Sequence, residues 1–123
     1  MIIGIVTADG REATIPLLLR GPSGRELVLR AIVDTGFTGS LMLPRALVDD
    51  LALVYQGSQR GTLADGSGVY LDIHEATIVW DDQLRDVHVL VADGDPLVGM
   101  ALLRGYELTV LAVDGGAVRI AAL

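Results

Sequence analysis

The residues best suited to chemistry lie in one stretch, where an apolar segment runs into Asp34-Thr35-Gly36 and a second apolar segment follows at Leu41-Met42-Leu43. A carboxylate at the end of a buried strand is costly unless it is paired or hydrogen-bonded, so an Asp in this place suggests acid–base chemistry. The alternative is structural, because Asp-Thr-Gly also suits a loop in which the Asp caps a turn. The tripeptide alone leaves both interpretations open.

Other polar residues give weaker signals. His74 and His88 each lie in an alternating segment with no third ligand at a recognisable metal-binding spacing, so both are expected to face solvent. Turn chemistry explains Asp81-Asp82 and Asp93-Gly94-Asp95, which lack the longer run of oxygen ligands that calcium loops have. The sequence therefore predicts no metal site and no cofactor.

Composition narrows the class of protein. The chain has 123 residues, of which 51% are hydrophobic but only 4% aromatic, so its core must be built from aliphatic side chains. A net charge of −7, with basic residues scattered singly, argues against nucleic acid as a partner. There is no cysteine, which excludes disulfides and thiolate metal sites. The large aliphatic fraction predicts a buried interface with another molecule.

The sequence predicts neither a membrane span nor a secretion signal. No apolar stretch approaches the roughly 20 residues that cross a bilayer. The first apolar run has no basic residues before it, and Asp9 follows soon after, so a signal peptide is not expected. A cytoplasmic location without membrane association is the resulting expectation.

The elements that must position Asp34 are mostly strands. Apolar or alternating runs bounded by Asp-Gly and Gly-Pro turns predict strands at Ile2–Thr7, Ala13–Arg20 and Glu26–Val33. Two further hairpins are predicted later in the chain, and their arms are Val69–Trp80 with Leu84–Ala92, and Glu107–Val113 with Ala117–Ala121.

Two short helices are predicted, at Pro44–Leu53 and at Met100–Arg104. Proline is favoured in a first helical turn, where its missing N–H has no partner in any case. No linker or repeat interrupts the chain. We therefore expect a single all-β domain over residues 1–123, built as a partly closed barrel with one or two short helices.

The order of these motifs resembles that of retropepsins and their bacterial single-domain relatives. In that family a hydrophobic pair precedes Asp-Thr-Gly, as Ile32-Val33 does here, and two hydrophobic residues with a Gly precede a later short helix, as in Leu97-Val98-Gly99. Between them the family has a Gly-rich hairpin, the flap, at the place of Thr62–Tyr70. The resemblance covers nearly the whole chain and implies the retropepsin-like, acid-protease-half fold.

The resemblance also implies roles for individual residues. Asp34 is the expected catalytic carboxylate, Thr35 locks two active-site loops together through hydrogen bonds, and Gly36 lets the loop backbone approach substrate. Gly99 allows two backbone segments to pass closely, because it has no Cβ. The residues expected to contact substrate are Phe37, Ala64, Asp65, Gly66, Ser67, Gly68, Leu97, Val98 and Gly99.

The chain contains a single Asp-Thr-Gly, and so supplies only one of the two carboxylates that an aspartic protease uses. Peptide hydrolysis by aspartic proteases uses two carboxylates that share a proton. The resemblance therefore implies a homodimer in which Asp34 of each copy forms a dyad across a two-fold axis and cleaves a peptide or protein substrate. In the family the chain termini interleave at the dimer interface, whereas apolar ends can also be core strands of one subunit, and both readings stay open here.

One departure from the family pattern keeps alternatives open. The family usually has Ala or Ser after Asp-Thr-Gly, where this chain has Phe37. Its ring could narrow the substrate cleft or turn into the core. The first alternative function is a catalytically inactive dimerisation or peptide-binding module with the same fold. The second is a structural all-β domain in which Asp34 caps a turn.

Overall fold

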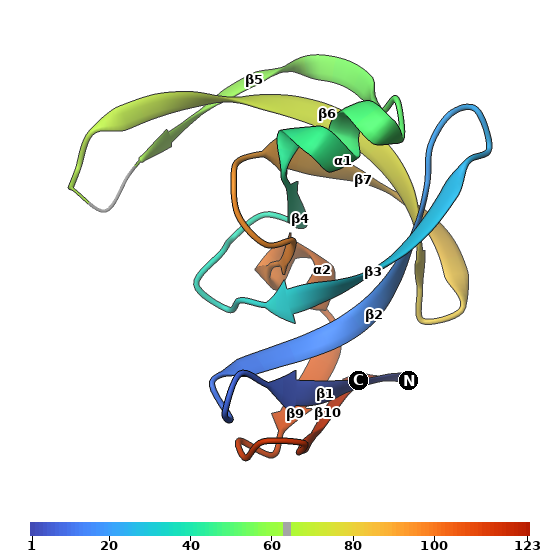
Figure 1. Cartoon of the computed structure of the whole chain (residues 1–123), viewed down its shortest axis with the longest axis vertical. Coiled ribbons are helices and arrows are strands. Elements are labelled where there is room, and N and C mark those ends of the chain that lie inside the picture. Colours follow the sequence, from blue (N-terminus) through green and yellow to red (C-terminus); the bar gives the residue numbers. More distant parts are fainter. Residues whose placement is uncertain (63–64) are drawn as a thin grey trace.

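The computed structural model describes residues 1–62 and 65–123, which form ten strands and two short helices (Figure 1). The strands are β1 (Ile2–Thr7), β2 (Glu12–Arg20), β3 (Glu26–Val33), β4 (Leu41–Leu43), β5 (Val54–Thr62), β6 (Gly68–Trp80), β7 (Gln83–Val91), β8 (Leu97–Val98), β9 (Tyr106–Val110) and β10 (Ala117–Ala122). The helices are α1 (Arg45–Asp50) and α2 (Met100–Leu103). The all-β class and its two short helices are confirmed.

The strands form one strongly curved sheet in the order β5-β6-β7-β4-β8-β3-β2-β1-β10-β9. An additional pairing of β6 with β2, through Leu18↔Val79 and Arg20↔Thr77, joins two distant parts of the sheet. The sheet therefore closes partly on itself, as expected. The β5–β6 hairpin extends beyond the rest of the sheet (Figure 1).

Alternating burial along the strands explains the core. In β6 every second residue from His74 to Trp80 is buried, and in β7 the buried residues are Val87, Val89 and Val91. Because successive side chains of a strand point to opposite faces, one face of this hairpin lies on the core while the other stays accessible. Aliphatic side chains dominate the core, with Trp80 as its one fully buried aromatic among the described residues.

Element boundaries follow the sequence patterns where the pattern is local. The strands predicted at Ile2–Thr7 and Glu26–Val33 have those bounds, and the strand predicted from Ala13 begins one residue earlier. The helix predicted over Pro44–Leu53 is shorter, because Pro44 is its N-cap and Leu51 its C-cap. Strand β5 was not predicted, since its exposed, largely polar sequence lacks an apolar face.

Both chain ends lie in the same part of the sheet. Strand β1 pairs antiparallel with β10, with Ile2 opposite Ile120, and also with β2. The ends are thus strands within one chain, which is one of the two readings of the apolar termini. The outer side of β1 nevertheless stays apolar and accessible, because Ile3 and Ile5 are 53% and 40% exposed.

Neither α1 nor α2 has the length and apolar character that a bilayer-crossing helix needs, and the described residues contain no other helix.

Candidate active site

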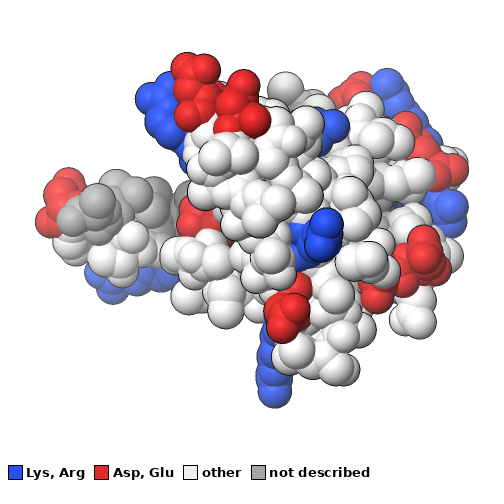
Figure 2. Space-filling model, turned by 90° about the horizontal axis from the view of Figure 1, so that it is seen from below, with Lys and Arg blue, Asp and Glu red and all other residues white. Residues whose placement is uncertain are grey.

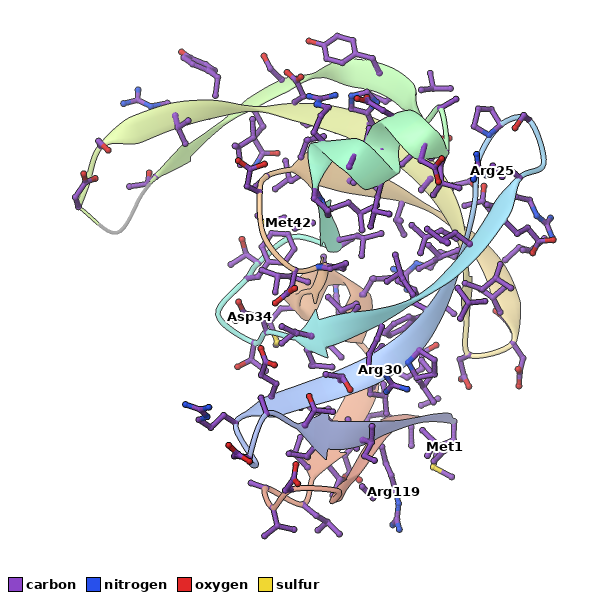
Figure 3. The ribbon with its side chains drawn as sticks, viewed as in Figure 1. Met1, Arg25, Arg30, Asp34, Met42 and Arg119 are labelled. Atoms are coloured by element: carbon purple, nitrogen blue, oxygen red, sulfur yellow. The ribbon has the colours of Figure 1, made fainter. Side chains whose placement is uncertain are left out.

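Three strand ends hold the segment that carries Asp34. Strand β8 lies between β3, to which it is parallel, and β4, to which it is antiparallel. Ile32 and Val33 are paired with Leu97 and Val98, so the chain emerges from β3 beside β8 and returns along β4. Figure 3 shows Asp34 at the end of β3, on the side of the molecule toward which the β5–β6 hairpin extends.

Backbone hydrogen bonds fix the loop that begins at Asp34. The Asp34 N–H donates to the Val98 carbonyl over 2.9 Å, the Phe37 N–H to the Asp34 carbonyl over 3.1 Å, and the Met100 N–H to the Phe37 carbonyl over 2.8 Å. The Gly36 N–H donates to Asp34 Oδ1 over 2.9 Å, which holds the carboxylate beside its own loop. Asp34 is half-buried, while Thr35 and Gly36 are exposed.

Gly99 lies where β8 passes closest to this loop. A Cβ on Gly99 would lie 2.3 Å from the Gly39 carbonyl oxygen and 2.6 Å from the Phe37 carbonyl oxygen, distances that no side chain tolerates. The predicted reason for a glycine, close passage of two backbone segments, is therefore confirmed.

The ring of Phe37 packs against glycines. Its Cδ2 would lie 2.6 Å from a Cβ on Gly99, and its Cζ would lie 2.6 Å from a Cβ on Gly39. Of the two orientations open from sequence, the ring takes an intermediate one: it is half-buried against these glycines, and one side of it borders an open pocket. The ring therefore occupies space that Gly39 and Gly99 provide.

The other residues expected to contact substrate fall into two groups. Val98 and Gly99 are buried behind the loop, so they support it and their side-chain positions face away from solvent, while Leu97 is half-buried. The remaining predicted residues belong to the β5–β6 hairpin, where those from Asp65 to Gly68 are exposed and Ala64 lies outside the described residues.

The described part of the hairpin tip is ordered by Asp65. Its Oδ1 accepts hydrogen bonds from the Ser67 hydroxyl at 2.6 Å and from the Ser67 N–H at 2.9 Å. These bonds favour the charged carboxylate and lower the pKa of Asp65 from its ordinary value of 3.8. Gly66 has φ +86°, a conformation that glycine adopts without cost.

A pocket of about 260 Å³ lies between the Asp34 loop and the hairpin. The loop supplies Phe37 to Ser40, and the facing wall is formed by side chains that sequence reasoning did not assign to the site. These are Gln59 of β5, Ile73 of β6, His88 and Leu90 of β7, and Ala101 of α2. Strand alternation could have indicated three of them, since Ile73, His88 and Leu90 lie on the face of β6 and β7 that points away from the core.

The expectation that both histidines face solvent is half wrong. His88 is exposed, but His74 is only 7% exposed, because it shares the inward alternation of Trp80. Its Nδ1 lies 2.8 Å from the Leu53 carbonyl and its Nε2 lies 3.4 Å from Arg45 Nη1. Arginine can only donate, so Nε2 accepts and Nδ1 carries the proton that is donated to Leu53.

Arg45 also binds Asp72 through Nη2 at 2.5 Å, so α1 is tied to the base of the β5–β6 hairpin. Tyr55 is 58% exposed, and its ring meets the His74 ring edge to face. Within the described ranges, no three His, Asp or Glu side chains are grouped so that they could hold a metal ion.

Comparison with known proteins identifies the fold. No family model matches the sequence, and no curated protein matches it. A retropepsin-like aspartic protease from Rickettsia conorii matches the structure with a TM-score of 0.60 and 16% identity, over 100% of this chain and 91% of that one. The EIAV protease, complexed with the inhibitor HBY-793, matches with a TM-score of 0.53 and 21% identity, over 76% of this chain and 86% of that one. The chain therefore has the retropepsin-like fold of aspartic proteases.

Proposed function

We propose that this chain is an aspartic endopeptidase whose active site forms when two copies place their Asp34 side chains together. The observation that carries the proposal is the position of Asp34. It is half-buried at the end of β3, its backbone is bonded to Val98, and its carboxylate accepts from Gly36. A carboxylate that only caps a turn does not need the three paired strands β3, β8 and β4 to position it.

The proposed mechanism uses the two carboxylates as a unit. Two like charges in contact cannot both ionise, so the dyad holds one proton between them at working pH. The ionised Asp34 takes a proton from water, and that water attacks the scissile carbonyl carbon. The protonated Asp34 of the other copy stabilises the developing oxyanion and then protonates the leaving amine. Exposed Thr35 is available to hydrogen-bond the second loop.

The β5–β6 hairpin is the proposed flap. It extends beyond the sheet on the side of Asp34 (Figure 3). Its described tip residues Asp65 to Gly68 are exposed. In the open form such a tip makes few contacts with the body of the protein. Its closure over a bound peptide would exclude water from the dyad and supply backbone hydrogen bonds to the substrate.

A second copy also has a surface to bind. Met1 before β1 is 65% exposed, Ile3 and Ile5 of β1 are 53% and 40% exposed, and Leu111 and Val113 beyond β9 are 53% and 64% exposed. Figure 2 views the molecule from the side of β1, β9 and β10, where uncharged residues cover much of the middle and charged side chains project among them. Strand β9 is an edge strand of the sheet, so its outer backbone groups are available for pairing with another chain. These features support a homodimer formed through this face.

The test combines self-association with cleavage. Sedimentation equilibrium at micromolar concentrations is expected to show a dimer, and a peptide library is expected to be cleaved by the native chain and not by Asp34→Asn. The Asn side chain keeps the shape but cannot act as the base, so the variant is expected to lose at least roughly a thousandfold in kcat. Cleavage by Asp34→Asn at the native rate would refute the mechanism. A dimer that binds peptides without cleaving them would establish the peptide-binding alternative.

A further inference from the structure

The pocket beside Phe37 lies where it could contact a side chain of a bound peptide substrate. One wall is the loop that continues from Asp34, and the other is formed by the two arms of the proposed flap and by β7. A peptide whose scissile bond lay at Asp34 would run between these walls. A side chain near the scissile bond would then enter the pocket, whose volume of about 260 Å³ is enough for one medium-sized side chain.

The lining combines an apolar base with a polar rim. Phe37, Ile73 and Leu90 provide aromatic and aliphatic surface for the methylene groups of an incoming side chain. Thr38, Ser40, Gln59 and His88 provide groups that donate hydrogen bonds. Among the described residues around the pocket, His88 is the one ionisable side chain, so any charge that the lining carries is positive.

We propose that this pocket is a specificity subsite for a substrate side chain that ends in a carboxylate, with His88 as its recognition residue. The inference rests on the proposed function, because it assigns a substrate class to the same cleft. A glutamate can place its methylenes against Ile73 and Leu90 while its carboxylate accepts hydrogen bonds from His88 and Gln59. A lysine or arginine would find no acidic partner in the lining and would oppose the charged imidazole.

The charges around His88 define how selectivity depends on pH. Glu75 lies directly opposite on β6, and Asp86 lies two residues away on the same face of β7, where it accepts from Thr77 at 2.7 Å. The loop, β5 and α2 contribute no charged group to the lining. Protonation gives an imidazole a positive charge that attracts a carboxylate, so selectivity for glutamate is expected to be stronger in acid than at alkaline pH. The Glu75 carboxylate would compete with a substrate carboxylate for His88. Neutralising Glu75 is therefore expected to strengthen the selectivity for glutamate.

The experiment compares cleavage of peptide pairs that differ only by Glu or Gln at each position near the cleaved bond. At about pH 5.5 the native dimer is expected to favour Glu over Gln at one position by roughly fivefold in kcat/KM, the size of an exposed ion pair, and this preference is expected to be smaller at about pH 7.5. His88→Gln keeps a hydrogen-bonding side chain without the charge and is expected to abolish the preference at both pH values. Glu75→Gln is expected to increase it.

A matched control removes a positive charge elsewhere. Arg25 lies far from Asp34 in the molecule (Figure 3), where it forms an exposed pair with Asp50, so Arg25→Gln is expected to keep the native preference. A Glu preference that survives His88→Gln, or the absence of a Glu preference over Gln at every position, overturns the assignment.

Binding separates this proposal from the proposed function. Asp34→Asn protein is titrated calorimetrically with the same Glu and Gln peptides, with and without His88→Gln. If the Glu peptide binds more tightly only when His88 is present, and the native chain cleaves no peptide, the assignment of the pocket is supported and the proposed protease activity is refuted. Cleavage without any dependence on His88 would refute the pocket and leave the protease in place.

Discussion

The ring of Phe37 occupies the space in which a side chain at Gly99 would lie: Phe37 Cδ2 would be only 2.6 Å from a Cβ on that glycine. The same Cβ would meet two carbonyl oxygens of the Asp34 loop, those of Gly39 and Phe37. The ring and the backbone of the loop therefore both depend on a glycine in the neighbouring segment. The loop that carries the proposed catalytic residue is held by close packing as well as by hydrogen bonds.

Gly99→Ala is expected to destabilise the protein by about 3 kcal/mol, the upper part of the range for overpacking. Removing the Phe37 ring relieves only part of the clash, because the two carbonyl oxygens remain. In a Phe37→Ala background, Gly99→Ala is therefore expected to lower the free energy of unfolding by less than in the native protein, but still by more than about 1 kcal/mol. Chemical denaturation of the four proteins measures the cycle. Gly61→Ala is the control, since a Cβ there meets nothing nearer than 3.6 Å. Equal costs for Gly99→Ala and Gly61→Ala would contradict this packing.

The exposed apolar side chains of β1 lead to a prediction about self-association. Ile3→Glu combined with Ile5→Glu is expected to weaken the dimer by at least about tenfold in Kd, because two charges would be buried in the interface without partners. Sedimentation equilibrium measures the change. Val28→Glu is the control, since Val28 is 65% exposed on β3. A dimer that tolerates both glutamates on β1 must use another surface.

The contacts of Arg45 lead to a prediction about the base of the hairpin. Arg45→Met keeps most of the aliphatic stem but removes the bonds to His74 and Asp72. Because Arg45 and Asp72 are both 44% exposed, the stability lost is expected to be only about 0.5–1 kcal/mol. Hydrogen exchange is expected to accelerate locally, in β5 and the adjoining part of β6. Arg85→Met, at an exposed position near the start of β7, is not expected to have this effect, and uniform acceleration in both variants would show that Arg45 does not hold the hairpin locally.

The lowered pKa of Asp65 leads to a prediction about the hairpin tip. The bonds from Ser67 depress the pKa of the folded state below 3.8, so their contribution is fully present above that pH and is lost as the pH falls through the folded-state pKa. Ser67→Ala removes the hydroxyl donor and is expected to raise the pKa of Asp65 toward 3.8. Carboxyl NMR titration measures the shift. Ser58→Ala, on β5, serves as the control, and an unchanged Asp65 titration in Ser67→Ala would show that the hydroxyl bond does not form in solution.

Much of the fold could be predicted from local patterns. The strand from Glu26 to Val33 has its predicted bounds because alternation and flanking turns encode a strand within its own few residues. The burial of His74 was also encoded, since it shares the alternation of Ala76, Ile78 and Trp80. Its polar residue type favours the solvent face, whereas its position in the alternation favours the core, and the alternation decides its burial. Strand β5 lacked any such pattern and depends on pairing with β6.

By itself the sequence determined that Asp34 follows a strand, that a glycine-rich hairpin and a Leu97-Val98-Gly99 segment come later, and that apolar strands dominate. Only the tertiary structure decided that β8 lies between β3 and β4, that the Phe37 ring packs against Gly39 and Gly99, and that His88 faces the same pocket as Phe37. The physical reason is the distance along the chain between the residues that interact. Alternation acts between neighbouring residues, whereas these contacts join segments far apart in the chain, whose approach depends on closure of the whole sheet.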